Sequence, residues 1–287
     1  MIYEFGSNTL RCKVSSMGAE LISVVHNGKE RLWQNDNGGW SGHAPILFPF
    51  AGSCEVVVDG VEYPAVKHGF ARKKEFSLVG CSREEITFVL RSDEETKAGY
   101  PFDFSLFVTY LVSGNLLKVL YKVVNEGEKT MYAGFGSHES YALDGEVDEF
   151  EVEFEKDEKF YALYASAETS KMTGEGRDFG AGKTLVLDRE FMQTDTIIFA
   201  DVNSHTVWLK RRGGETLARV SYPDFGNLLL WHPADSRMVC IEPWQNLPDD
   251  HGKAPQELSK KKGLTAIPPK GEATAYHEIE YFEIIGK

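Results

Sequence analysis

Regular alternation of apolar and polar residues over short stretches is the feature that most limits how this chain can fold. In FDFSLFVTYLV, one face of an extended strand would carry Phe102, Phe104, Leu106, Val108 and Tyr110. The turn sequence SGN at 113–115 then leads into LLKVLYKVVN, so the two stretches predict a long hairpin. No stretch has the 3.6-residue period of a long amphipathic helix, and the best helical candidate is a short one at 254–259.

Short β-rich segments separated by Gly, Asn and Asp recur along the rest of the chain. They include EFSLVG, EITFVLRS, TDTIIFADV, HTVWLKRR, ETLARVSY, NLLLWH, MVCIEP and ATAYHEIEYFEII. Many strands with frequent turns and almost no helix predict an all-β fold, as a β-sandwich or a barrel. No Pro/Ser-rich linker and no change in composition divides the chain, so we expect one domain over residues 1–287.

The composition is that of a soluble protein and excludes several classes of function. Hydrophobic residues make up 42% of the chain, and no run approaches the roughly 18 apolar residues that span a bilayer. The formal net charge of −13 would repel phosphate backbones, so we expect no nucleic-acid partner. The 4 cysteines are scattered without a CxxC pair, which argues against a zinc site or a disulfide framework. Reduced thiols and an N-terminus without a leader pattern predict a cytoplasmic protein with no membrane contact.

A run of acidic residues occupies 146–160, EVDEFEVEFEKDEKF. Acidic and apolar residues alternate in it, as expected for a strand with one solvated face. We expect this run to form either a sheet edge or one face of a long hairpin, because charges along an edge oppose pairing with another chain.

Three polar clusters stand at the ends of apolar stretches. KHGFARKKEF contains His68 and Arg72, YAGFGSHESYAL contains His138, and CIEPW contains Glu242. Taken singly, each histidine is also explained as a hydrogen-bonded structural residue, and Arg72 as a surface charge. Glycines on both sides of Phe135, shortly before His138, would let the backbone bend sharply or approach a ligand closely.

Glu242 is the least ordinary of these polar residues. Within MVCIEP it shares one strand face with Cys240, while its neighbours in the strand take the other face. Pro243 follows it and donates no hydrogen bond, so we expect Glu242 at a strand end, partly buried beside Trp244. Partial burial raises the pKa of a carboxyl group and makes it a better base near neutral pH.

Together, these side chains suit a ligand rich in hydroxyl groups, such as a sugar. Candidate aromatic platforms are Trp33, Trp40, Phe48, Phe50, Phe70, Phe135, Trp231 and Trp244. The sequence lacks the GxSxG, GxGxxG, P-loop and HExxH patterns, so it offers no nucleophile elbow, no nucleotide loop and no metalloprotease helix.

In their order and spacing, the motifs resemble the aldose 1-epimerase (galactose mutarotase) family, in its bacterial LacX-like branch. APILFPFAG, HGFAR, CIEPW and the closing IPPKGEATAYHEIEY match family motifs, and GSHESY stands where the family has Gly-Gly-His-Pro-Ala-Phe. The resemblance runs nearly from end to end. It implies a large antiparallel β-sandwich and an isomerase of carbohydrate metabolism. The reaction would interconvert the α and β anomers of an aldohexose, or of a hexose 6-phosphate, without a metal or another cofactor.

The resemblance also implies roles for individual residues. Glu242 would act as general base on the C1 hydroxyl, and His138 as general acid on the ring oxygen, with the roles reversed on closure. His68 would hold the sugar and stabilise charge on the ring oxygen. Arg72 would bind sugar hydroxyls or a phosphate. Asp195, in QTDTIIF, would bind sugar hydroxyls unless it only caps a turn.

Two departures from the family pattern leave alternatives open. Ser53 stands where the family usually has arginine, which weakens the phosphate-sugar interpretation. Glu139 replaces the proline after His138 and would either pair with His138, raising its pKa, or face water. The chain could therefore be a sandwich that binds or senses a sugar without catalysis. A glycoside hydrolase or lyase would need a second carboxylate opposite Glu242, for which Asp195 is the candidate. Monomer and homodimer both remain open.

Overall fold

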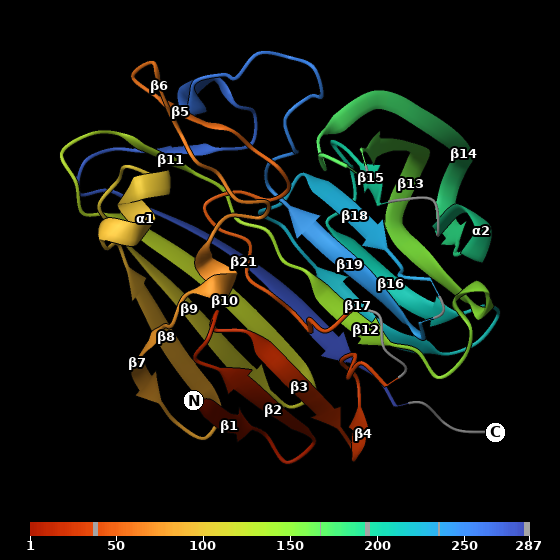
Figure 1. Cartoon of the computed structure of the whole chain (residues 1–287). Coiled ribbons are helices and arrows are strands. Elements are labelled where there is room, and N and C mark those ends of the chain that lie inside the picture. Colours follow the sequence, from red (N-terminus) through yellow and green to blue (C-terminus); the bar gives the residue numbers. More distant parts are fainter. Residues whose placement is uncertain (37–39, 167, 193–195, 235, 284–287) are drawn as a thin grey trace.

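The computed structural model describes residues 1–36, 40–166, 168–192, 196–234 and 236–283, and within them it confirms an all-β, antiparallel fold. The largest sheet has 13 strands in the order β12-β19-β18-β15-β13-β16-β17-β21-β10-β9-β8-β7, with β14 paired to β13. It runs from β7 and β8 on one side to the β13–β14 hairpin on the other (Figure 1). Its strands are β7 (Ser77–Cys81), β8 (Glu85–Arg91), β9 (Phe104–Ser113), β10 (Leu116–Asn125), β12 (Glu139–Ala142), β13 (Phe150–Ala165), β14 (Met172–Val186), β15 (Ile197–Phe199), β16 (Thr206–Arg211), β17 (Thr216–Ser221), β18 (Asn227–Trp231), β19 (Met238–Trp244) and β21 (Glu272–Tyr281).

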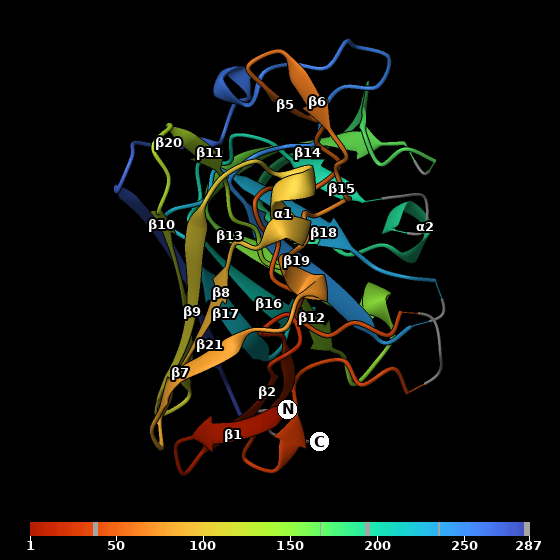
Figure 2. The same ribbon diagram turned by 60° about the vertical axis from the view of Figure 1, so that its left-hand side comes forward.

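A four-stranded sheet packs against one end of the large sheet. Its strand β1 contacts β8 and β9 (Figure 2). The hydroxyl of Tyr110 donates to the carbonyl of Ala19 at 2.6 Å. The smaller elements are β1 (Ile2–Gly6), β2 (Leu10–Ser15), β3 (Leu21–His26), β4 (Lys29–Glu30), β5 (Val56–Val58), β6 (Val61–Tyr63), β11 (Met131–Ala133), β20 (Thr265–Ile267), α1 (Glu94–Gly99) and α2 (Arg189–Met192). No helix among these described elements is long and apolar enough to cross a membrane.

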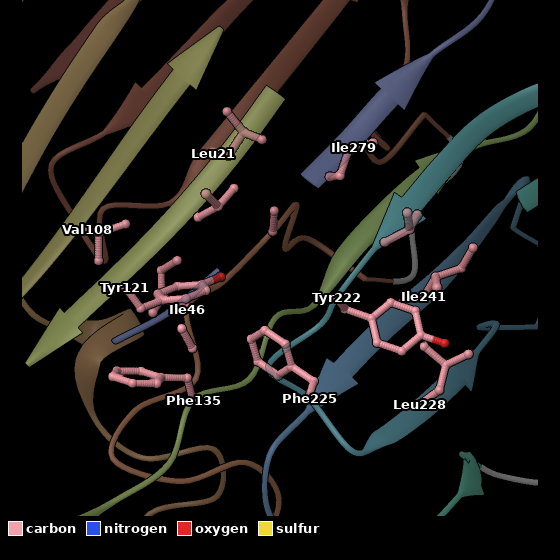
Figure 3. Packing of buried hydrophobic residues seen from close by; sticks show 14 of the residues in the cluster. Leu21, Ile46, Val108, Tyr121, Phe135, Tyr222, Phe225, Leu228, Ile241 and Ile279 are labelled. Atoms are coloured by element: carbon pink, nitrogen blue, oxygen red, sulfur yellow. The ribbon is translucent and has the colours of Figure 1, made fainter. Parts of the chain in front are cut away.

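One large cluster of buried apolar side chains fills the space between the sheets. Figure 3 shows part of it, with Leu21 from β3, Tyr121 from β10 and Ile241 from β19. The alternation predicted for the central hairpin is confirmed. Strands β9 and β10 pair in register over ten residues, with buried and more exposed positions alternating along both. Period-two patterning therefore sets which side chains of the hairpin enter the core.

Two local predictions need correction. The acidic run does form a long hairpin with β14, but β13 is not a sheet edge, because its other side pairs with β15 and β16. Its apolar residues Val152 and Phe154 are buried in the core, while β14 takes the outer position. The predicted helix at 254–259 is also wrong: only a 3₁₀ turn over Leu258–Lys260 forms there.

Strand β19 also continues further than expected, through Pro243 to Trp244. Pro243 pairs with Leu228 of β18, while its carbonyl accepts from the backbone N–H of Ser137 on the other side, at 3.1 Å. The nitrogen and the carbonyl of one strand residue point to the same side. The nitrogen of Pro243, which cannot donate, therefore points towards Ser137, beyond the paired residues of β12. The pairing with β18 on the other side loses no hydrogen bond.

Candidate functional site

Four of the five residues predicted for the site line one pocket of about 460 Å³. His68 and Arg72 come from the segment between β6 and β7, His138 directly precedes β12, and Glu242 lies in β19. The fifth, Asp195, lies outside the described residues. A pocket of this size is within the range that accommodates small ligands.

Strand register brings His138 and Glu242 together. Glu139 pairs with Ile241 across β12 and β19, so the residues just beyond this pair, His138 and Glu242, are also neighbours. The Nδ1 atom of His138 lies 3.5 Å from Oε1 of Glu242. Both side chains are buried, and neither Nδ1 of His138 nor Oε2 of Glu242 has a hydrogen-bond partner within the described residues. Unpartnered buried polar atoms are uncommon in proteins, and they are typical of functional sites.

Burial shifts the pKa values of Glu242 and His138 in opposite directions. It raises the pKa of Glu242 well above its usual range, and the charge of Glu139 adds to this effect. Burial likewise lowers the pKa of His138 to about 4, with smaller contributions from Arg72 and Lys67. At neutral pH, His138 is therefore an uncharged imidazole, while Glu242 holds a proton more tightly than an exposed glutamate does.

His68 is held in an orientation that makes it a donor. The backbone N–H of Gly52 donates to its Nδ1 at 3.0 Å, so the proton of the neutral ring is on Nε2. Burial lowers the pKa of His68 well below its usual value, and the nearby charges of His138, Lys67 and Arg72 lower it further. The ring packs edge-on against Trp244 and His138, with centroid distances of 5.4 and 5.7 Å.

The backbone that presents His68 is unusual. His68 has φ of +65°, and Gly69 follows with φ of +68°. A Cβ on Gly69 would lie 2.0 Å from the carbonyl oxygen of Phe48, so only glycine fits there without displacement. The close approach lets the N–H groups of Phe70 and Ala71 donate to the same Phe48 carbonyl, at 3.0 and 3.3 Å.

Three tryptophans form the aromatic walls of the pocket. Trp40 stacks on His138 with a centroid distance of 4.8 Å and an interplanar angle of 21°. Trp231 meets the same ring edge-on at 5.9 Å, and Trp244 lies behind His68. The sequence named eight candidate platforms without choosing among them. Phe48 and Phe135, by contrast, belong to the core.

Arg72 and Lys67 supply positive charge at the pocket. The Arg72 guanidinium donates to the carbonyl of Lys67 at 3.1 Å, and burial lowers its pKa, although arginine remains charged at neutral pH. The Lys67 side chain is exposed to solvent and also lines this pocket. Ser53 lies in a neighbouring pocket of about 370 Å³, which Lys67 also lines.

Glu139 neither pairs with His138 nor faces water, although its charge does act to raise the pKa of His138. Its side chain is buried in the core, where Oε1 lies 2.9 Å from Nε2 of His277 in β21. Alternation along β12 explains the error, because the strand turns His138 to the pocket and the next side chain to the interior.

Among the described residues, one group has the composition of a metal site. Single ligand atoms of His138, Cys240 and Glu242 lie within 4.8 Å of one another. Burial and the nearby carboxylates raise the pKa of the Cys240 thiol well above its usual value, so the thiolate that a metal would need is disfavoured. A cation there would also engage both members of the acid–base pair.

A larger pocket of about 590 Å³ lies on the far side of Pro248. Its charged groups largely neutralise one another: Lys261 pairs with Asp249, and Lys253 lies 2.6 Å from Asp250. It contains no unpartnered acid–base pair of the kind formed by His138 and Glu242, within the residues that the structure describes. The chemistry therefore favours the smaller pocket.

Comparison with known proteins identifies the family. The model of the aldose 1-epimerase family matches residues 1–263. The chain belongs to the aldose 1-epimerase family. The plasmid-encoded protein LacX of Lactococcus lactis subsp. lactis is 31% identical over 264 residues, covering 86% of this chain and 88% of LacX. This similarity confirms both the family and the LacX-like resemblance of the motifs.

Solved structures agree with this assignment. A galactose mutarotase related enzyme from Lactobacillus acidophilus superimposes with a TM-score of 0.88 at 26% identity, covering 99% of this chain and 98% of that one. A galactose mutarotase-like protein from Lactobacillus casei ATCC 334 gives a TM-score of 0.90 at 24% identity, covering 98% and 100%. The galactose mutarotase-like β-sandwich expected for the family is thereby confirmed.

Proposed function

We propose that this member of the aldose 1-epimerase family is a mutarotase, which interconverts the α and β anomers of an aldohexose by opening and closing the ring. The juxtaposition of His138 and Glu242 carries the proposal: two buried groups 3.5 Å apart, each with an unpartnered atom among the described residues. Leaving buried polar atoms unpaired costs about 1–3 kcal/mol each. A protein that only grips a sugar has no need of such a pair, whereas acid–base catalysis does.

The pair performs ring opening as follows. Ring opening starts from the ionised form of the pair, in which the proton of Glu242 has passed to His138. The Glu242 carboxylate accepts the proton of the C1 hydroxyl, while protonated His138 donates to the ring oxygen and the bond from C1 to the ring oxygen breaks. The open-chain aldehyde remains beside a protonated Glu242 and a neutral His138. This neutral form is the one that burial favours, since burial raises the pKa of Glu242 and lowers that of His138. After rotation about C1–C2, both protons return and the ring closes on the other face.

The remaining groups hold the sugar in place. The Nε2–H of His68 is positioned as a donor by the Gly52 hydrogen bond and would stabilise charge on the ring oxygen. Trp40 offers an aromatic face beside His138. Arg72 would bind hydroxyl groups, and Asp195 keeps its proposed role in hydroxyl binding. Because Arg72 and Lys67 both line the pocket, a hexose 6-phosphate is the second candidate substrate.

The decisive measurement is anomer exchange, followed by NMR saturation transfer on glucose, galactose and their 6-phosphates. We expect wild-type protein to accelerate exchange for at least one of these sugars. Glu242→Gln, which keeps the shape of the side chain but not its basicity, should lower the rate by roughly 10²–10⁴-fold while still binding the sugar. Exchange no faster than in buffer for every sugar would support a non-catalytic sugar-binding protein instead.

A further inference from the structure

The interior holds an acid–base pair that the proposed reaction does not use. Glu139 of β12 and His277 of β21 are both buried, with 2.9 Å between Oε1 and Nε2. On its other side, Nδ1 of His277 lies 3.5 Å from the hydroxyl of Tyr121 in β10. Strand β12 ends the large sheet, whereas β21 and β10 lie far along it, so this contact crosses the interior of the sandwich.

Stability alone does not explain this pair. Removing a carboxylate from water costs several kcal/mol, and well-packed apolar residues often stabilise such a position as well or better. The pairing is also incomplete, because Oε2 of Glu139 has no hydrogen-bond partner among the described residues. Most side chains around it belong to the apolar cluster, including Ile241, its partner across β12 and β19.

The position of Glu139 links it to both members of the proposed catalytic pair. It follows His138 in the chain, and its partner Ile241 precedes Glu242. Because adjacent strand residues face opposite ways, His138 and Glu242 point into the pocket while Glu139 points into the core directly behind them. Fixing Glu139 in the core therefore fixes the backbone on which His138 and Glu242 meet.

Glu139 also carries charge into the interior. Burial would raise its pKa, but the charge and hydrogen bond of His277, together with polar groups of Ser137 and the backbone, outweigh burial, so the net pKa is below the usual value. The ionisable groups that interact electrostatically with it are His277 and Tyr281 of β21, Tyr121 of β10, Tyr110 of β9, Tyr141 of β12, Cys240 and Glu242 of β19, and His138. The tyrosines and the thiol stay neutral, because burial raises each of their pKa values.

We propose that Glu139 and His277 are positioning residues for the catalytic site: together they hold β12 in place across the core, and Glu139 keeps a negative charge behind Glu242. The expected change in kcat/KM rests on the proposed mutarotase activity. The expected change in the pKa of Glu242 does not. Glu139 touches no substrate; it acts through His138 and Glu242. The negative charge of Glu139 raises the pKa of Glu242, as burial also does. A higher pKa makes the Glu242 carboxylate a better acceptor of the sugar proton.

The central test is Glu139→Gln, which keeps an amide oxygen to accept from His277 and removes the charge. The limb of the kcat/KM profile that follows ionisation of Glu242 should move to lower pH, because the pKa of Glu242 falls when the charge behind it is removed. We expect kcat/KM at neutral pH to fall by roughly 10-fold, because Glu242 becomes a weaker base when the charge behind it is removed. The conservative Glu139→Asp, which restores the charge, should return the limb towards its wild-type position.

The matched control is Glu158→Gln. Glu158 of β13 is likewise buried, and its Oε1 accepts from the backbone and side chain of Ser204 at 2.6 and 2.7 Å. We expect this variant to lose stability without moving the limb that follows ionisation of Glu242. If Glu139→Gln behaves like Glu158→Gln, losing stability with an unchanged limb, Glu139 is merely structural and the proposal is overturned.

Two further arrangements keep the outcome decisive. If Glu139→Gln fails to fold, His277→Gln replaces it: Glu139 then takes up a proton at higher pH, and the limb again extends to lower pH. The ionisation of Glu242 is also followed directly by ¹³C NMR of its side-chain carboxyl, assigned by comparison with Glu242→Gln, which needs no activity. An inactive wild type would sink the mutarotase proposal alone. An unchanged Glu242 titration in Glu139→Gln would overturn the positioning proposal.

Discussion

Burial acts on single residues of the pocket according to the charge that each would carry. It raises the pKa of the Glu242 carboxyl and lowers that of the His138 imidazole, because in both cases the charged form is disfavoured. Both shifts favour the uncharged form of the pair. Such groups give up stability for reactivity, and the dependence of that stability on pH is measurable.

The stability of the protein should fall on acidification through His138. The unfolded chain binds a proton at this imidazole near pH 6.5, whereas the folded protein does so only at about 4. Between these values the unfolded state binds more protons, so stability is lost as pH falls. Between pH 7 and pH 5, the free energy of unfolding measured by chemical denaturation should fall by roughly 2 kcal/mol less in His138→Gln than in wild type. Equal losses in both proteins would contradict the assignment.

Among the segments of the chain, the one that presents His68 is the most constrained. It passes so close to Phe48 that Gly69 has no room for a side chain, and both His68 and Gly69 have positive φ. The hairpin turn between β9 and β10 has a comparable glycine, Gly114, with φ of +60° but open space around it. The two glycines therefore separate the cost of the backbone conformation from the cost of a clash.

We expect Gly69→Ala to be far more damaging than Gly114→Ala. Both substitutions place a side chain in the left-handed region, at a cost of roughly 1–2 kcal/mol. Gly69→Ala adds a clash with the Phe48 carbonyl, worth roughly 1–3 kcal/mol more, and it displaces His68. Urea denaturation and anomer exchange together test this, since Gly114→Ala should keep its activity. Similar losses of stability and activity in the two variants would show that the backbone around Gly69 can move to relieve the clash at little cost.

At the scale of the whole molecule, β21 joins the two halves of the large sheet. It pairs with β10 on one side and with β17 on the other, although it lies near the end of the sequence. Its buried residue Ile279 belongs to the large apolar cluster (Figure 3). The cluster includes side chains from both sheets, so a cavity made at β21 should weaken the molecule as a unit.

Ile279→Ala should destabilise the protein by about 2–5 kcal/mol, the usual cost of deleting a buried aliphatic side chain. The matched control is Ile2→Ala, at a position 64% exposed, which should change stability by less than about 0.5 kcal/mol. Tryptophan fluorescence and circular dichroism should follow the same denaturation curve in Ile279→Ala. Separate transitions would mean that the two halves of the sheet unfold independently.

Much of the fold and part of the site were determined by the sequence alone. A strand has a period of two, so alternation in 104–112 and in MVCIEP was enough to predict the central hairpin and to place Glu242 and Cys240 on one face. Family motifs then pointed to His68, Arg72, His138 and Glu242, and these four line one pocket.

Tertiary structure decided what local pattern cannot express. Whether β13 lies inside the sheet or at its edge depends on β15 and β16, which follow it in the chain and pair with its far side. Glu139 looked like a neighbour of His138, yet the register with Ile241 turned it towards His277, 138 positions along the chain. The partner that a buried side chain meets is set by strands that come together only after the sheet has formed, so no local period reveals it.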